Sequence, residues 1–214
     1  MKHKLVLFDL DGTLLDTLGD LAEAVNVAME SKGYPLHTLE EYRGMVGHGV
    51  RNLVTQAMPA DLQQDEALID SCLEIFTKHY KAHIADRTCP YPGMQELVKR
   101  LDEEGVKLAV ASNKFQSGTE TLVEQFFPGI PFVAVLGNRP GYPLKPDPAI
   151  VGEVLRRSGI AKEDAVMVGD SATDMKTAQN GGIKGIAVSW GYRSLAGTPG
   201  LTVVSSVEEL ESFL

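Results

Sequence analysis

Residues 5–13 read Leu-Val-Leu-Phe-Asp-Leu-Asp-Gly-Thr, an apolar run followed directly by two aspartates. Four apolar residues bounded by turn residues are typical of a short strand that is buried on both faces. Because Asp9 and Asp11 are two positions apart, both can point toward one site before the chain turns at Gly12. An Asp-Gly pair alone marks only a turn, but polar groups follow later strands as well. The segment therefore predicts a strand that ends in functional carboxylates, at the sheet edge where α/β enzymes place their sites.

The chain after residue 90 alternates between helical and strand periodicity. We expect helices over 94–104, 117–126, 147–157, 172–180 and 207–214, and strands over 107–111, 132–136, 165–168, 185–188 and 201–204. This alternation predicts an α/β fold, a doubly wound parallel sheet with helices on both faces. The strand at residues 5–8 belongs to the same sheet.

A helical region follows the first strand. From residue 16 to residue 86 no strand pattern is visible, and apolar residues recur at helical spacing. We expect one helix from Leu18 that ends before Gly33, and further helices over 38–45, 50–58 and 61–83. Residues 16–86 are therefore expected to form an inserted helical domain, and residues 1–15 with 87–214 the α/β core domain. The two links between them can act as a hinge.

Composition and charge exclude several classes of protein. The 214 residues are 43% hydrophobic and 23% charged, as in ordinary soluble globular proteins. The formal net charge of -9 disfavours binding to nucleic acid, and no basic cluster offsets it. The longest apolar run near the N-terminus, residues 5–8, is too short for a signal peptide or a membrane span. We expect a cytoplasmic protein with no nucleic acid and no membrane as partner.

Polar side chains also follow two later strands of the predicted sheet. Ser112 comes after one of them, and Asp170 and Asp174 come after another. In a parallel sheet these positions share one edge with Asp9 and Asp11. Two carboxylates about 4 Å apart repel by roughly 4 kcal/mol at an effective dielectric near 20, so a cation must be present or some groups must be protonated. Oxygen ligands without a Cys or His cluster favour Mg²⁺ over zinc, with phosphate as a natural co-ligand.

One lysine stands out because its backbone is constrained. Lys145 has three prolines within three residues of it, which favours a positioned ammonium over an ordinary solvated one. Lys114 has no such bracing, and we expect it in a loop as a surface charge. Ser112 and Ser171, taken singly, are more typical of helix caps than of ligand contacts.

The order of these motifs resembles that of the haloacid dehalogenase superfamily, over the full chain. The motifs are residues 9–13, then Ser112, then Lys145 before Pro146, and then residues 169–174 (Gly-Asp-Ser-Ala-Thr-Asp). The helical insertion after the first strand is similar to that of the subfamily with a helical cap. Within it, the segments most similar to phosphoglycolate phosphatases are 11–16, 46–50 and 91–93.

The resemblance implies a role for each core residue. Asp9 would be the nucleophile that becomes aspartyl-phosphate, and Asp11 would protonate the leaving oxygen and later activate water. Ser112 would bind the phosphoryl oxygens, and Lys145 would neutralise charge on Asp9 and phosphate.

The implied cofactor is Mg²⁺. Its ligands would be Asp9, the backbone carbonyl of Asp11, and Asp170. Asp174 would hold metal-bound waters or a neighbouring ligand.

Substrate contacts are expected from both domains. Residues 44–51 form a glycine-rich loop that ought to reach the active site when the cap closes, and a loop that opens a helix is a place where backbone amides can meet an anion. For the cap residues a plain surface position is equally compatible with the sequence. The expected substrate contacts are Thr13 and Asn113 in the core and Arg43, His48 and Arg51 in the cap.

The resemblance favours phosphoglycolate, whose carboxylate would need a cation in the cap, within the wider class of small phosphorylated metabolites. Pyrophosphate, nucleotides and sugar phosphates are alternatives, because a second phosphate needs the same cations. A sugar phosphomutase would use the same machinery, although Thr13 is more typical of phosphatases. A phospho-accepting signalling module needs no inserted domain, and a non-catalytic binding protein would normally have lost Asp9 or Asp11. A monomer and a homodimer are both compatible with the sequence.

Overall fold

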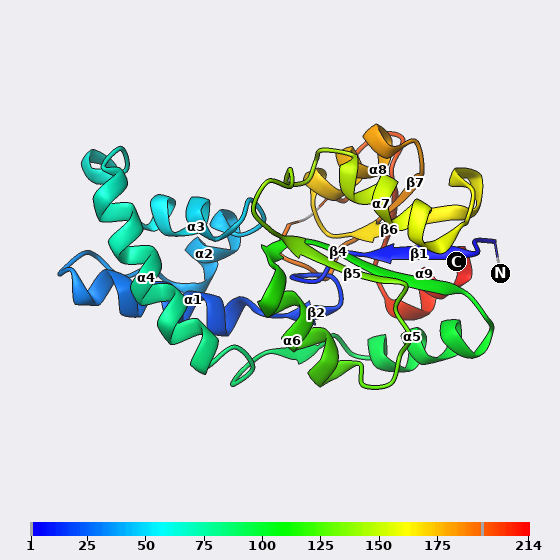
Figure 1. Cartoon of the computed structure of the whole chain (residues 1–214), viewed down its shortest axis with the longest axis horizontal. Helices are drawn as coiled ribbons and strands as arrows, with labels where there is room; N and C mark the ends of the chain where they lie inside the picture. Colours follow the sequence, from blue (N-terminus) through cyan, green and yellow to red (C-terminus); the bar gives the residue numbers. More distant parts are fainter. Residues whose placement is uncertain (1, 194) are drawn as a thin grey trace. The chain divides into compact units, whose positions relative to one another are not determined.

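The computed structural model describes residues 2–193 and 195–214 and divides the chain into two compact units. One unit consists of Met1–Asp16 with Pro90–Leu214, and the other of Thr17–Cys89. Figure 1 shows that the first unit contains a sheet flanked by helices and that the second is built from helices. We refer to them as the α/β unit and the helical unit.

Six parallel strands form the sheet of the α/β unit, in the order β5-β4-β1-β6-β7-β8. Helices α7 and α8 cover one face, and α5, α6 and α9 cover the other (Figure 1). This arrangement confirms the predicted doubly wound α/β fold. The strands are β1 (Leu5–Phe8), β4 (Lys107–Phe115), β5 (Ala134–Asn138), β6 (Ala165–Gly169), β7 (Lys184–Val188) and β8 (Thr202–Val204); the helices are α5 (Met94–Glu103), α6 (Gln116–Phe126), α7 (Ala149–Ser158), α8 (Ala172–Gly181), α9 (Val207–Phe213) and the 3₁₀ turn η2 (Lys162–Asp164).

Strand β1 lies inside the sheet and is buried on both faces, as its apolar run predicts. All four of its side chains are fully buried. Leu5 and Leu7 pack in a core cluster with residues of β4, β6 and α7, among them Ala109, Met167 and Val154. Because strand side chains alternate, the other two residues of β1 point to the opposite face. Full burial of one such side chain stabilises the fold by about 1.5–3 kcal/mol.

Two strands differ from the predicted bounds by more than one residue. The strand expected at 132–136 begins at Ala134, because residues 130–132 make a tight turn in which the Phe132 N–H donates to the Ile130 carbonyl (2.9 Å). The strand expected to end at Ala111 continues to Phe115. The polar residues at its end are therefore part of the sheet and not of a loop.

The helical unit contains α1 (Leu18–Ser31), α2 (Leu39–Met45), α3 (Val50–Ala57), the 3₁₀ turn η1 (Ala60–Leu62) and α4 (Glu66–Ala82). The expectation of one helix over 61–83 is wrong. Asp65 starts a separate helix, because its carboxylate accepts the Leu68 N–H (3.1 Å) and caps α4. Apolar periodicity alone does not register such a cap within a helical pattern.

A buried carboxylate joins the two ends of the helical unit. Asp20, in the first turn of α1, accepts hydrogen bonds from the backbone N–H groups of Arg87 (2.9 Å) and Thr88 (2.8 Å) and from the Thr88 hydroxyl (2.7 Å). Beside these residues, β2 (Leu15–Asp16) pairs with β3 (Cys89–Pro90) in a two-stranded sheet. Both chain links between the units are thus tied by hydrogen bonds.

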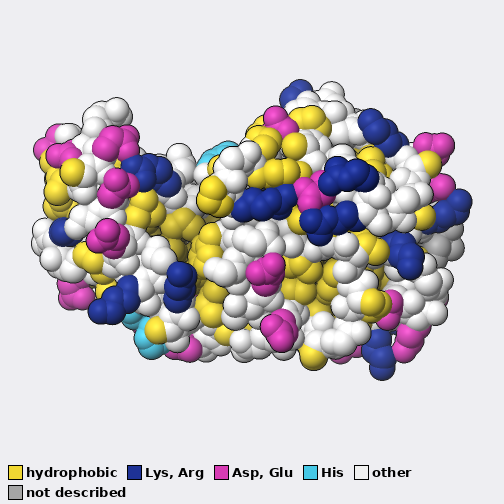
Figure 2. Space-filling view, in the orientation of Figure 1, with side chains coloured by type: hydrophobic (Ala, Val, Ile, Leu, Met, Phe, Trp, Pro, Cys, Tyr) yellow, Lys and Arg dark blue, Asp and Glu magenta, His cyan; other side chains and the backbone are white. Residues whose placement is uncertain are grey.

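On the face of the molecule seen in Figure 2, basic and acidic side chains are interspersed. In the parts of the chain that the structure describes, no helix has the length and apolar character that crossing a bilayer requires.

Candidate active site

The register of the sheet decides where the first aspartate emerges. Phe8, the last residue of β1, pairs with Val110 of β4 on one side and Val168 of β6 on the other. The next N–H, that of Asp9, still donates to the Val168 carbonyl (2.9 Å). Asp9 therefore leaves the sheet level with the end of β6, and Asp170 lies just beyond that strand.

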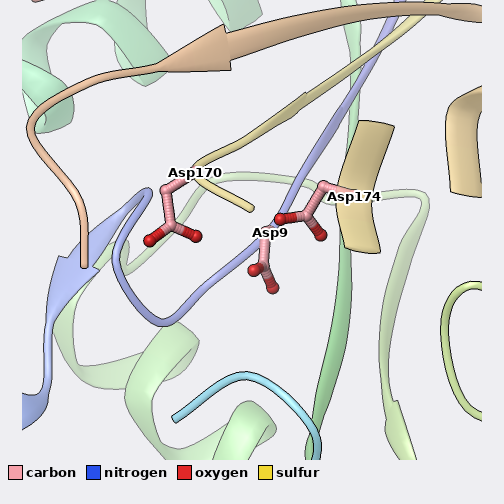
Figure 3. A group of neighbouring side chains, drawn as sticks. All are labelled: Asp9, Asp170 and Asp174. Carbon is pink, nitrogen blue, oxygen red and sulfur yellow. The ribbon is translucent and has the colours of Figure 1, made fainter. Parts of the chain in front are cut away.

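Three carboxylates lie together at this edge. Asp9, Asp170 and Asp174 are buried, and each offers an oxygen within 4.8 Å of the others. Figure 3 shows the three groups pointing toward a shared space from the ends of β1 and β6 and from the first turn of α8. The structure thus brings together residues that lie more than 160 positions apart in the sequence.

Asp174 is placed by the cap of its own helix. Ser171 caps α8, since its hydroxyl accepts the Asp174 N–H (3.3 Å), and the Asp174 carboxylate in turn accepts the Ser171 N–H (3.1 Å). This reciprocal capping box satisfies two N–H groups that a helix start leaves unpaired. Ser171 therefore has the capping role that its residue type suggests, and Asp174 is held rigidly by the helix start.

Lys145 lies against this cluster. Its Nζ is 2.9 Å from Oδ1 of Asp9 and 2.6 Å from Oδ1 of Asp174, and its side chain is almost fully buried. Asn113 holds the backbone of the lysine at both ends: its side-chain amide donates to the Lys145 carbonyl (3.1 Å), and its oxygen accepts the Lys145 N–H (2.8 Å). The amide of Asn113, expected at the substrate, thus positions Lys145.

The charges in the cluster do not balance within the protein. Burial, reinforced by Asp174, raises the pKa of Asp9 well above its usual range and that of Asp170 to about 7. Burial alone would lower the pKa of Lys145, but Asp174 and Asp9 outweigh it and raise that pKa. Three buried carboxylates thus share one ammonium. Their donor set is all oxygen, which fits a hard divalent cation such as Mg²⁺.

A bulge in β4 directs further side chains to the same edge. Between the pairs Ala111–Leu136 and Phe115–Asn138, β4 advances four residues while β5 advances two. Bulges of this kind turn side chains in new directions. Ser112, in the bulge, is buried, and its hydroxyl accepts the Lys114 N–H (3.2 Å). Its alternative role, as the cap of the following helix, is not seen, because Phe115 occupies that position without a side-chain cap.

Lys114 is the site residue that the sequence did not reveal. The sequence predicts a surface charge in a loop, but Lys114 lies in β4 with its side chain buried, and its Nζ is 3.0 Å from Oδ1 of Asp11. A Ser-Asn-Lys triplet after an apolar strand resembles the start of a loop. Only the bulge, which depends on pairing with β5, shows that the strand continues.

Residues 12 and 13 complete the loop after β1. Gly12 has a positive φ of 84° that side chains other than glycine rarely adopt. Thr13 is fully buried, and its hydroxyl has no hydrogen-bond partner among the residues that the structure describes. An unsatisfied buried hydroxyl costs about 1–3 kcal/mol, which a polar ligand can recover.

The three cap residues differ in their surroundings within the helical unit. Arg51 forms ion pairs with Glu66 and with Asp70 (2.6 Å), and Arg43 pairs with Glu40 (3.3 Å). His48 is exposed.

Comparison with known proteins places this geometry in a family. The family model described as haloacid dehalogenase-like hydrolase matches residues 6–188. A phosphoglycolate phosphatase of Mesorhizobium japonicum is 35% identical, covering 90% of this chain and 85% of its own. One of Pseudomonas savastanoi is 37% identical, covering 88% and 70%. A crystal structure from Lactobacillus delbrueckii subsp. bulgaricus, provisionally assigned as a phosphoglycolate phosphatase, has a TM-score of 0.92 and 35% identity and covers 100% of this chain and 98% of its own.

Proposed function

Since this chain belongs to the haloacid dehalogenase-like hydrolases, we propose that it removes the phosphoryl group from a small metabolite by way of an aspartyl-phosphate on Asp9. The family and the curated relatives make it a phosphoric monoester hydrolase. The position of Asp9 carries the mechanistic part of the proposal. Asp9 is buried at the sheet edge, against an ammonium and two further carboxylates.

In the first step, a carboxylate oxygen of Asp9 bonds to phosphorus while the bond from phosphorus to the leaving oxygen breaks. Asp11 gives its proton to that oxygen, so the alcohol leaves neutral. Lys145 lowers the repulsion between the Asp9 carboxylate and the phosphate. Ser112 donates its hydroxyl hydrogen to a phosphoryl oxygen and keeps the group in line.

In the second step, water attacks the phosphorus of the acyl phosphate. Asp11, now a carboxylate, takes a proton from this water, inorganic phosphate leaves, and the Asp9 carboxylate is restored. Lys114 holds Asp11 in place for both transfers (3.0 Å). The unpaired hydroxyl of Thr13 is available to the bound phosphate or its surroundings.

Mg²⁺ is the cation we propose for the cluster, where it would neutralise charge on phosphate and Asp9. Asp9, Asp170 and the backbone carbonyl of Asp11 are its proposed ligands. Asp174 already accepts hydrogen bonds from Lys145 and Ser171, so we assign it the positioning of Lys145 and of metal-bound water.

Phosphoglycolate is the proposed substrate, because relatives at 35% and 37% identity are named for that activity. In the cap we propose His48 as the first residue to test for a substrate contact, since Arg43 and Arg51 already pair with carboxylates of their own unit. A His48→Ala variant should raise KM more than it lowers kcat.

The decisive experiment measures phosphate release and the covalent intermediate together. Purified protein with Mg²⁺ should hydrolyse phosphoglycolate in preference to pyrophosphate, sugar phosphates and nucleoside monophosphates. Acid quenching during turnover should leave one phosphoryl group on the peptide that contains Asp9. Asp9→Asn should lower kcat by roughly 10⁶-fold, as loss of a nucleophile does in a well-studied protease, while Asp61→Asn, at an exposed position, should not. Isomerised product without phosphate release would indicate a mutase, and labelling at another residue would overturn the role of Asp9.

A further inference from the structure

Asp170 is held by a segment that the sequence motifs do not include. This segment, residues 189–193 (Ser-Trp-Gly-Tyr-Arg), follows β7, and we call it the strap. Its first residue is anchored to the sheet, because the Ser189 N–H donates to the Val204 carbonyl of β8 (3.0 Å). From there the strap crosses to the loop after β1 and to the end of β6.

Backbone and side-chain hydrogen bonds from the strap reach this edge of the sheet. The backbone N–H of Tyr192 donates to Oδ2 of Asp170 (2.7 Å), within the buried part of the site. The indole N–H of Trp190 donates to the carbonyl of Thr13 (3.2 Å). One bond fixes a carboxylate of the acidic cluster, and the other fixes the loop that carries Asp11.

The strap approaches so closely that it requires a glycine. A Cβ on Gly191 would lie 2.3 Å from the Asp170 Cβ and 2.3 Å from the Gly12 carbonyl oxygen. A Cβ on Gly12 would lie 2.4 Å from Oδ2 of the same aspartate. The carboxylate of Asp170 is thus confined between two glycine backbones. Figure 3 shows one of its oxygens turned toward Asp9 and Asp174 and the other turned away.

We propose that the strap is the positioning element for the Mg²⁺ ligand Asp170, and that Gly191 is the residue on which this positioning depends. The inference rests on the proposed function in so far as Asp170 is a metal ligand. Partners that orient a ligating group change metal affinity by about 10- to 100-fold when they are altered. Neither Trp190 nor Gly191 needs to touch the substrate for this effect.

The fluorescence of Trp190 can report Mg²⁺ binding. Trp190 is the only tryptophan in the sequence and lies on the strap. A titration with Mg²⁺ alone should therefore change the intrinsic fluorescence, and isothermal titration calorimetry gives the same affinity independently. Both measurements need no substrate and no turnover.

The test compares three proteins. Gly191→Ala should weaken Mg²⁺ binding about 10- to 100-fold, and its activity should recover at high Mg²⁺ with KM for the substrate near that of the wild type. Gly152→Ala is the matched control, because a Cβ at Gly152 in α7 meets no atom within 4 Å, and it should bind Mg²⁺ as the wild type does. A folded Gly191→Ala with wild-type Mg²⁺ affinity overturns the role of the strap.

Two further outcomes are separable. If Gly191→Ala does not fold, judged by circular dichroism, Trp190→Phe replaces it. This variant removes the indole N–H that donates to Thr13 and keeps an aromatic ring at the position. Its affinity is measured by calorimetry, and an unchanged affinity overturns the proposal. If the wild-type protein itself does not bind Mg²⁺, the proposed function fails and the inference fails with it.

Discussion

The Nζ of Lys145 lies 2.6 Å from Oδ1 of Asp174, and neither side chain exposes more than 2% of its surface. The same ammonium lies 2.9 Å from Asp9. Removal of one partner from a buried ion pair leaves uncompensated charge and typically costs 3–5 kcal/mol. The lysine is therefore expected to support the fold of the α/β unit as well as the reaction.

A Lys145→Met variant tests both roles. Without metal, its free energy of unfolding in urea should fall by about 3–5 kcal/mol, and Mg²⁺ should restore part of the loss. Its kcat should fall by about 10²- to 10³-fold, as for the loss of an electrostatic donor. Lys99→Met is the control, since Lys99 is exposed and its Nζ is 3.7 Å from Glu103; it should change stability by less than about 0.5 kcal/mol. Wild-type stability of Lys145→Met would contradict the charge argument.

Metal binding should raise the thermal stability of the folded protein. A ligand at 100 times its Kd stabilises the folded state by about 2.7 kcal/mol, which for a chain of this length raises Tm by about 5–10 °C. Mg²⁺ should produce this rise in the wild type, and chelation should abolish turnover. In Asp170→Asn the rise should be smaller at the same Mg²⁺ concentration, because one anionic ligand is lost. Equal Tm values with and without Mg²⁺ in the wild type would argue against a metal at the acidic cluster.

We expect Asp20 to stabilise the fold of the helical unit. Its replacement by alanine leaves the N–H groups of Arg87 and Thr88 without their acceptor, at about 1–3 kcal/mol for each buried group. We expect Asp20→Ala to lose about 3 kcal/mol in urea unfolding and Asp20→Asn, which keeps one acceptor oxygen, to lose less. Asp61→Ala, at an exposed position, is the control. Wild-type stability of Asp20→Ala would contradict the role of these hydrogen bonds.

The fold could be predicted because its signals are periodic and local. The apolar run Leu5–Phe8 and the alternation after residue 90 depend only on neighbouring residues, and they sufficed to predict a parallel sheet with Asp9 at its edge. Lys145 was predictable as a positioned lysine because the prolines beside it restrict the backbone, and the structure buries it.

The remaining parts of the site depend on pairing between distant segments. Lys114 reaches Asp11 only because β4 bulges against β5, and the strap reaches Asp170 only because β7 lies beside β6. Neither contact produces a periodic pattern of residues from which the sequence alone could predict it. The break before α4 was missed for another reason: Asp65 is one polar residue within a helical pattern, and its capping role appears only in its hydrogen bond to Leu68.

The proposed roles of Asp11 predict a kinetic signature that depends on the leaving group. p-Nitrophenolate leaves without a proton, so phosphorylation of Asp9 by p-nitrophenyl phosphate should not need the acid, whereas hydrolysis of the intermediate still needs the base. Asp11→Asn should therefore release a burst of nitrophenolate followed by turnover about 10²- to 10⁴-fold slower than wild type. With phosphoglycolate it should show no burst, because both steps are slow.

Lys114→Met should give the same pattern more weakly. Its ammonium contacts Asp11, so we expect a loss of about 10²-fold in kcat through misplacement of the acid. Mg²⁺ affinity, read from the fluorescence of Trp190, should stay at the wild-type value. Lys107→Met, at the exposed start of the same strand, controls for the loss of a lysine from β4. If Lys114→Met lowered kcat equally for p-nitrophenyl phosphate and for phosphoglycolate and gave no burst, the lysine would act on phosphate and not through Asp11.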